Sequence, residues 1–309
     1  MYPLAIQKET PMARAVPQAQ LSDPKLEKSL LVKSIVLFIV IAPFVATLYA
    51  MWSLWNNGVD ALDVSLMLVL YILSGMGITV GFHRMLTHKA FESQPWFKGM
   101  MLIFGCLAVE GDPTTWASTH IQHHAHSDEE DDPHSPMEGL WHSHVGWLFN
   151  YQANPEVYGT WLRRDPVVVW VTKTWFIWVI VGFLIPTLIA GWSGLLWGGF
   201  VRVFLTHHIT WSVNSICHTF GRRDYQTRDA SRNNFIVGLL AFGEGWHNNH
   251  HAFPRSAFHG LRWWQIDTSG YFISICEKLG LVWNVYRVKL EDQKKRVIVN
   301  THAEVMGGD

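Results

Sequence analysis

The residues of this chain that are best suited to chemistry are its histidines, 17 among 309 residues. Most of them fall into four short clusters. His83 and His88 form an HxxxxH pair, and His218 ends the segment Asn214-Ser-Ile-Cys-His218. The other two clusters have HxxHH spacing and consist of His120, His123 and His124, and of His247, His250 and His251. Dispersed surface histidines would not produce this clustering, which favours a metal site.

The HxxHH spacing predicts how the imidazoles point if each cluster is helical. Positions i and i+4 of an α-helix differ by about 40° around the axis, and position i+3 lies about 60° to the other side. We therefore expect each cluster to aim three imidazoles at one point from a single helix face. Imidazole suits iron, zinc, copper and nickel. The nine clustered histidines exceed the four ligands of a structural zinc site, so the expected number of metal ions is two.

The segments that must position these histidines are strongly apolar. Hydrophobic residues make up 49% of the chain and charged residues only 16%, against about 25% charged in a typical soluble domain. Four apolar segments approach or exceed the roughly 20 residues that a membrane-spanning helix needs. They cover residues 31–55, 62–82, 167–190 and 192–211. The connection between the first and second segments is very short, and so is the connection between the third and fourth. We therefore predict an all-α integral membrane protein with four transmembrane helices in two hairpins.

The basic residues predict the orientation of these hairpins. None of the 24 Lys and Arg residues lies in 34–83 or 174–201. Under the positive-inside rule, the short turns then face away from the cytoplasm. The histidine clusters and both termini are expected on the cytoplasmic side, where a helical cap would hold the metals. The net charge of −1 gives no indication of a nucleic-acid partner.

The two ends of the chain are predicted to be tails. Residues 1–29 carry scattered charges without an apolar period and lack the features of a secretory signal, so we expect a flexible N-terminal tail. Residues 288–309 are expected to form a charged C-terminal tail, which leaves 30–287 as one membrane domain. Two shorter apolar stretches, 96–109 and 235–242, are too short to cross a bilayer and are predicted to be interfacial or buried helices.

The order HxxxxH, HxxHH, NSxxH and HxxHH resembles that of the membrane fatty-acyl desaturases, in particular the Δ9 (stearoyl-type) branch, from about Leu30 to Tyr286. Four further segments are similar to that branch: Asp132-Pro-His134, Ser143-His144-Val-Gly-Trp147, Thr210-Trp211 and Gly243-Glu244-Gly-Trp246-His247. The resemblance implies a di-iron site in which Asn214 contacts one iron through a water molecule. The iron ligands it implies are His83, His88, His120, His123, His124, His218, His247, His250 and His251.

The resemblance also implies a reaction, the O₂-dependent introduction of a cis double bond, at Δ9, into a saturated acyl chain. Unactivated methylene groups have no acidity, so this chemistry belongs to the metal cofactor and requires no catalytic residue beyond the ligands. In the family, a Trp four residues before the second box and a Thr four residues before the Asn line the bend of the acyl tunnel. They correspond to Trp116 and Thr210 as substrate-binding residues.

The acyl carrier stays open at this point. Animal acyl-CoA enzymes of the family carry Arg-Asp directly before the second box, where this chain has Ser118-Thr119. Both acyl-CoA and an acyl-lipid are therefore candidate substrates. No haem-binding or CxxC segment indicates a fused electron carrier, so we expect a separate donor of the ferredoxin or cytochrome b5 type.

Two alternatives to a desaturase remain. A fatty-acyl or lipid hydroxylase or ketolase could use the same scaffold, because desaturation and hydroxylation differ in how the substrate is placed. A non-redox membrane metal-binding or transport protein is the third hypothesis. It predicts ionisable groups within the spans along a pathway, whereas the histidine clusters here flank the apolar segments.

Overall fold

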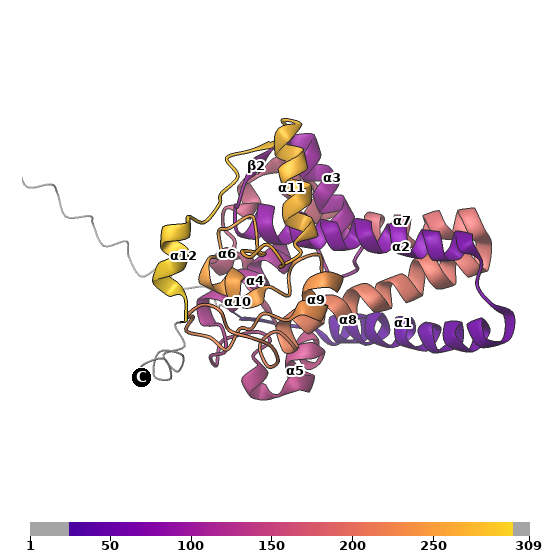
Figure 1. Cartoon of the computed structure of the whole chain (residues 1–309). Helices are drawn as coiled ribbons and strands as arrows, with labels where there is room; N and C mark the ends of the chain where they lie inside the picture. The colour runs from indigo at the N-terminus through magenta and orange to yellow at the C-terminus, as the bar shows by residue number, and fades with distance from the viewer. Residues whose placement is uncertain (1–24, 299–309) are drawn as a thin grey trace, which may run out of the picture.

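The computed structural model describes residues 25–298, which are mostly helical, as predicted. The long helices are α1 (Leu30–Asn57), α2 (Ala61–Met76), α7 (Pro166–Gly194) and α8 (Arg202–Ser215). Two π-helical segments continue this region, η1 (Gly77–Thr87) after α2 and η5 (Leu195–Val201) between α7 and α8. Figure 1 shows the long helices extending from one side of a head that contains the shorter elements.

Within residues 25–298, three helical stretches are long and apolar enough to cross a membrane, namely Leu30–Asn57, Ala61–Thr87 and Pro166–Ser215. The third, of 50 residues, is broken at Ala190 and Gly191, and Gly191 has φ 62° and ψ −137°, a backbone conformation that only glycine adopts readily. Beyond the break the chain folds back, because Gly194 lies against the backbone of Pro186 and Arg202 donates to the Gly182 carbonyl. Pro166–Ser215 is therefore a helical hairpin, and its turn falls between the predicted segments 167–190 and 192–211.

The head is built from short elements around a buried core. They are α3 (Pro95–Cys106), α4 (Pro113–His126), η2 (Pro136–Glu138), α5 (Leu140–His144), η3 (Gly146–Phe149), α6 (Pro155–Tyr158), η4 (Leu162–Arg164), α9 (Phe235–Leu240), α10 (His247–Ala252), α11 (Thr268–Lys278) and α12 (Leu290–Arg296). Two small antiparallel sheets pair β1 (Lys25–Glu27) with β3 (Tyr151–Ala153) and β2 (Glu92–Ser93) with β4 (Val282–Trp283). The core cluster includes Phe82, Phe97 and Leu102, directly behind the first histidine pair.

Both short apolar stretches form helices. α3, which covers most of the predicted stretch 96–109, buries Phe97 and Met101 in the core. α9, within 235–242, instead leaves Phe235 and Ile236 exposed by 52% and 67%. The prediction of buried or interfacial helices is therefore confirmed for α3 by its burial, and α9 presents the apolar outer face that an interfacial helix has.

The predicted tails are too long. Lys25–Glu27 pair with Tyr151–Ala153, and α12 packs on the head through Tyr225, whose hydroxyl donates to Gln293 Oε1 at 3.1 Å. The folded part of the chain therefore extends beyond 30–287 at both ends. Local composition did not indicate this, because both segments are held by residues far away in the sequence. The rest of the predicted tails, 1–24 and 299–309, lies outside the described residues.

Candidate metal centre

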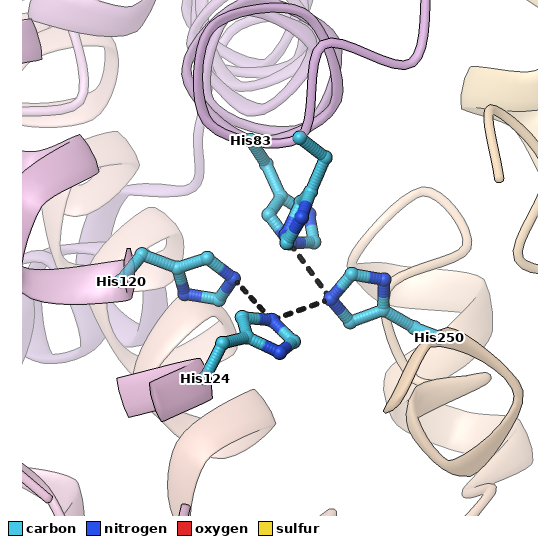
Figure 2. A group of neighbouring side chains, drawn as sticks. His83, His120, His124 and His250 are labelled. Atoms are coloured by element: carbon cyan, nitrogen blue, oxygen red, sulfur yellow. Dashed lines mark hydrogen bonds between the residues drawn. The ribbon is translucent and has the colours of Figure 1, made fainter. Parts of the chain in front are cut away.

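The nine histidines predicted to be ligands meet inside the head in two groups. The first group is His83, His88, His120, His124 and His250, and the second group is His123, His218, His247 and His251. Within each group the potential ligand atoms lie within 4.8 Å of one another. Figure 2 shows four rings of the first group turned toward a common centre from three different parts of the chain.

The spacing of the nitrogen atoms in the first group fits one metal ion. His250 Nε2 lies 3.1 Å from His83 Nε2 and 2.9 Å from His124 Nε2. Ligands about 2.1 Å from a metal are about 3.0 Å apart at right angles and about 3.4 Å apart in a tetrahedron. His88 Nε2 is buried without a hydrogen-bond partner among the described residues, as a ligand atom would be. Five nitrogen atoms at this spacing suit a metal with more than four ligands.

The second group has the same spacing. His247 Nε2 lies 2.9 Å from His218 Nε2 and 3.0 Å from His251 Nε2. His123 Nε2 lies 3.3 Å from His251 Nε2. This group therefore offers four imidazole nitrogens to a second metal and can leave positions for other ligands.

The expectation that each HxxHH cluster aims three rings at one point is wrong. On α4, His120 and His124 belong to the first group while His123 belongs to the second. On α10 the assignment is reversed, because only His250 joins the first group. The i and i+4 rings stay together because they are about 40° apart, but the i+3 ring is about 100° from its neighbour at i+4 and reaches the other centre. Each cluster thus bridges both groups.

The π-helical winding of η1 explains the wider spacing of the first pair. Residues five apart would differ by about 140° around an α-helix, but in a π-helix they are hydrogen-bonded neighbours. The His88 N–H donates to the His83 carbonyl at 3.1 Å, and the two rings lie 4.7 Å apart. The winding therefore brings both imidazoles to the same group.

Carboxylates with little solvent exposure orient one ring of the first group and three rings of the second group. In the first group, His83 Nδ1 lies 2.6 Å from a Glu244 oxygen. In the second group, His123 Nδ1 lies 3.0 Å from Asp132 and His218 Nδ1 lies 3.0 Å from Asp128. His251 Nδ1 lies 2.8 Å from Asp229. A carboxylate accepts, so Nδ1 carries the proton and Nε2 is left free for a metal. The acidic run of residues 128–132, next to the second cluster, left a role behind the histidines and a solvated loop equally open, whereas no sequence feature indicated such a role for Asp229 or Glu244.

Burial favours the neutral form of six of the nine imidazoles. It is the main cause that lowers the pKa of His123 to about 3. Burial, together with the charges of neighbouring imidazoles, also lowers the pKa well below its usual range for His88, His120, His124, His247 and His250. The unprotonated form is the one that binds a metal, so the site is ready to accept metal ions at neutral pH.

The remaining predicted site residues lie together in one cavity. Trp116, Thr210 and Asn214 line a cavity of about 380 Å³, which we call the acyl cavity, and His120 of the first group forms part of its wall. Most of its lining is apolar, and one side is formed by α1 through Ile35 and neighbouring residues. The structure thus brings the three residues beside the histidines.

Glu110 is a residue of the acyl cavity that the sequence patterns did not indicate. Its Oε2 accepts a hydrogen bond from the Trp116 indole at 3.0 Å. Burial raises the pKa of Glu110 to about 7, against the opposing effects of the Trp116 and Thr210 hydrogen bonds. The carboxyl group therefore connects the two predicted substrate-binding residues, and no short-range spacing could have identified it.

Comparison with known proteins gives a family match over most of the chain. A family model described as fatty acid desaturase matches residues 62–278. The sn-1 stearoyl-lipid 9-desaturase of Anabaena variabilis is 43% identical over 239 residues, which cover 76% of this chain and 86% of the relative. The Delta-9 acyl-lipid desaturase 1 of Arabidopsis thaliana is 41% identical over 236 residues, 74% and 77% of the two chains. The hex-5-enoyl-(acyl-carrier protein) acetylenase of Moorena producens is 39% identical over 280 residues, 84% and 87% of the two chains.

Proposed function

This chain belongs to the fatty acid desaturase family, and we propose that it uses O₂ and a di-iron centre to place a cis Δ9 double bond in a saturated acyl chain of a membrane lipid. It is an integral membrane enzyme of the oxidoreductase class. The observation that carries the proposal is the pair of histidine groups, five and four rings, beside an apolar cavity.

The two histidine groups would each hold one iron. Once bound, the irons supply the oxidising power that an unactivated methylene group requires. The overall reaction consumes the saturated chain, one O₂, two electrons and two protons, and yields the unsaturated chain and two water molecules. Asn214, in the wall of the acyl cavity, would contact one iron through a water molecule.

The acyl cavity would select the carbon atoms that react. Its apolar lining suits an alkyl chain and excludes water, and His120 places part of that lining beside the first histidine group. Trp116 and Thr210 would fix where the chain bends, and Glu110 would hold the Trp116 indole in place through its hydrogen bond. Regiochemistry then follows from positioning alone.

The surroundings of the second histidine box support a lipid-bound substrate. Ser118 is fully buried and donates to the Thr114 carbonyl. A Cβ added to Gly159 would lie 2.6 Å from Ser118 Oγ, so the packing leaves no room for the Arg that the animal acyl-CoA enzymes of the family carry there. The α1 wall of the acyl cavity belongs to a candidate membrane span, which would let a lipid chain enter from the bilayer. Two relatives are named as lipid desaturases.

We also propose that the chain crosses the membrane four times, with the histidine groups on the cytoplasmic side. The hairpin turn at Gly191 supports two crossings within Pro166–Ser215. The absence of Lys and Arg from 34–83 and 174–201 supports the orientation.

The test is to supply the iron-loaded full chain, in lipid nanodiscs, with isotope-labelled stearoyl lipid or labelled stearoyl-CoA, a chemical reductant and O₂. Mass spectrometry would locate the new double bond. We expect a Δ9 monoene on the lipid, lost in His250→Ala and retained in His142→Ala, a histidine outside both groups. A hydroxylated product would favour the hydroxylase alternative, a triple bond would favour an acetylenase, and conversion of stearoyl-CoA alone would overturn the proposed carrier.

A further inference from the structure

A short loop with a strained backbone forms one wall of the acyl cavity. It covers residues 107–112, between α3 and α4, and its residues from Val109 to Asp112 line the cavity. Val109 has φ 63° and is the only β-branched residue with a positive φ in residues 25–298. Branched side chains rarely adopt this conformation. Such strain persists only where the surrounding structure holds it in place.

The loop carries the residue that connects the two predicted substrate-binding residues. Glu110 follows Val109 directly, and its carboxyl group is hydrogen-bonded to the Trp116 indole and to Thr210. The two backbone angles of a residue set the direction in which the chain continues. Relaxation of Val109 to a negative φ would therefore turn Glu110 away from both partners. The shape of the acyl cavity at its proposed bend depends on this one strained residue.

Arg202 holds the beginning of the loop. Its guanidinium is fully buried and donates to the carbonyl of Leu107, the residue that caps the C-terminus of α3. It also donates to the carbonyl of Gly182 in α7 at 3.3 Å and to that of Gly198 in η5 at 3.1 Å. The C-terminus of a helix carries a partial negative charge, so a cation beside Leu107 is electrostatically favourable.

The charge of Arg202 lies in an apolar environment. The residue belongs to the candidate span Pro166–Ser215, and no carboxylate within residues 25–298 pairs with it. A charged side chain inside a membrane span costs free energy, and such residues usually serve a function. Arg202 joins the end of α3 to α7 and η5 at a cost that an apolar side chain in the same place would avoid.

His207 holds the strained residue itself. Its Nε2 donates to the Val109 carbonyl at 3.3 Å. The ring is buried and stacks on that of Trp211, with 4.7 Å between the centroids, and Trp211 in turn lines the acyl cavity. His207 belongs to neither histidine group of the metal centre. Its imidazole is therefore free to bind the loop.

We propose that Arg202 and His207 are positioning residues that hold the loop 107–112 in its strained shape and thereby determine which carbon atoms of the acyl chain react. The inference rests on the proposed function, because it gives these residues a part in the regiochemistry of that reaction. Neither residue lines the acyl cavity, so both act through the loop. Together with Thr210, they make α8 the support on which this wall of the cavity is built.

The first test compares double-bond positions in His207→Leu and His207→Gln, with labelled stearoyl lipid as substrate. Leu removes the donor to the Val109 carbonyl, whereas Gln keeps an N–H donor. We expect the share of double bonds outside the wild-type position to rise about tenfold or more in H207L, because displacing a reacting group by about 1 Å changes its rate by about 100-fold. H207Q should restore the wild-type position.

His208→Leu is the matched control. His208 also contacts the Trp211 ring, with 5.3 Å between the centroids, but bonds His144 instead of the loop. H208L should therefore keep the wild-type position. A purely structural role of His207 predicts less folded H207L protein whose double bonds stay at the wild-type position, and that outcome would overturn the proposal.

Arg202 is tested by Arg202→Lys, because Arg202→Met can prevent folding. Lys keeps the charge but lacks the planar fork that reaches three carbonyls. We expect R202K to spread the double bonds over neighbouring positions as H207L does. A wild-type distribution in folded R202K would remove Arg202 from the proposal.

Hydrogen–deuterium exchange of the full chain in nanodiscs tests the anchoring without any turnover. The peptide that covers residues 107–112 should exchange faster in H207L and R202K than in the wild-type chain and H208L, because fewer bonds then hold the loop. Faster exchange with an unchanged double-bond position would show that the loop does not set the regiochemistry. If the wild-type chain forms no unsaturated product, the proposed function is wrong, and equal exchange in all four proteins would show separately that the loop is not anchored by these residues.

Discussion

Single carboxylates decide which histidine nitrogen faces the metal centre. Glu244 is the most connected of them, since it lies 2.6 Å from His83 Nδ1 and 3.3 Å from His259 Nδ1. It also pairs at 3.1 Å with Arg84, a guanidinium that is fully buried and is held on its other side by Asp267. One acidic side chain therefore connects His83 of the first group to the loop that follows α10.

Glu244→Gln should weaken metal binding by the first group. Removing a carboxylate behind a ligating histidine commonly lowers metal affinity by about 10–100-fold, and Gln also leaves Arg84 with one carboxylate instead of two. The second group contains no residue bonded to Glu244 and serves as an internal reference. The measurement is metal affinity by titration and elemental analysis. Glu138→Gln, which disturbs only the exposed pair with His142, is the control, and equal affinities in both variants would contradict the assignment.

Glu110 should make activity dependent on pH. Its pKa is raised to about 7, so the folded protein binds the proton more tightly than the unfolded chain does, and the neutral form prevails below pH 7. Above that pH a charged carboxylate would face the acyl chain. We expect wild-type activity to fall as pH rises through about 7. Glu110→Gln, which keeps an acceptor for the Trp116 indole, should lose this fall, and an unchanged pH profile would count against the role of Glu110.

The sequence was sufficient to identify the histidines that the fold brings together, but not the residues behind them. Clustering identifies the nine histidines, because their spacing is local. Asp229 instead bonds His251 across 22 residues of sequence, and Glu110 meets Thr210 only when the cavity forms. Such pairings depend on long-range folding, which single-sequence spacing does not report.

At the scale of secondary structure, the type of helix decides how the histidines are shared. The HxxHH prediction assumed that one helix serves one point, but α4 and α10 each supply both groups. The π-helix η1 was also unforeseen, although the HxxxxH spacing is the spacing that such a helix brings to one face. The spacing of the histidines can be read from the sequence. Their division between the two groups depends on how α4, α10 and η1 pack against one another.

α12 should stabilise the second histidine group. It binds the segment before Asp229 through Tyr225–Gln293 and through the Gln226 N–H, which donates to the Arg296 carbonyl at 2.8 Å. Truncation after Lys289 should lower both thermal stability and metal retention by the second group, because each lost hydrogen bond costs about 1 kcal/mol and the Asp229 loop loses its support. Truncation after Ile298 is the matched control. Equal melting temperature and metal content in the two truncations would show that α12 has no such role.

At the scale of the whole molecule, two helical hairpins carry one cap that contains all nine histidines. The sequence predicted the helical class, the apolar segments and the position of the break near residue 190, because each of these follows from the hydropathy of a short stretch of chain. It did not predict that β1 and α12 join the head, since β1 pairs with Tyr151–Ala153 and α12 contacts Tyr225, both far away in the sequence.

The proposed topology is tested by cysteine labelling. The three native cysteines are buried, so introduced thiols should dominate the signal. A membrane-impermeant maleimide applied to intact cells should label Asn57→Cys and Ser193→Cys, near the two hairpin turns, and should label Lys294→Cys on α12 only after the membrane is opened. Labelling of Asn57→Cys without Ser193→Cys, or of Lys294→Cys in intact cells, would contradict four crossings with a cytoplasmic cap.

The metal content of the purified full chain tests the central claim most directly. Two histidine groups predict about two irons per chain, and fewer than two both in His88→Ala, which alters the first group, and in His218→Ala, which alters the second. His142→Ala, outside both groups, should keep two. One metal per chain, zinc in place of iron, or full iron content in both ligand variants would contradict the account.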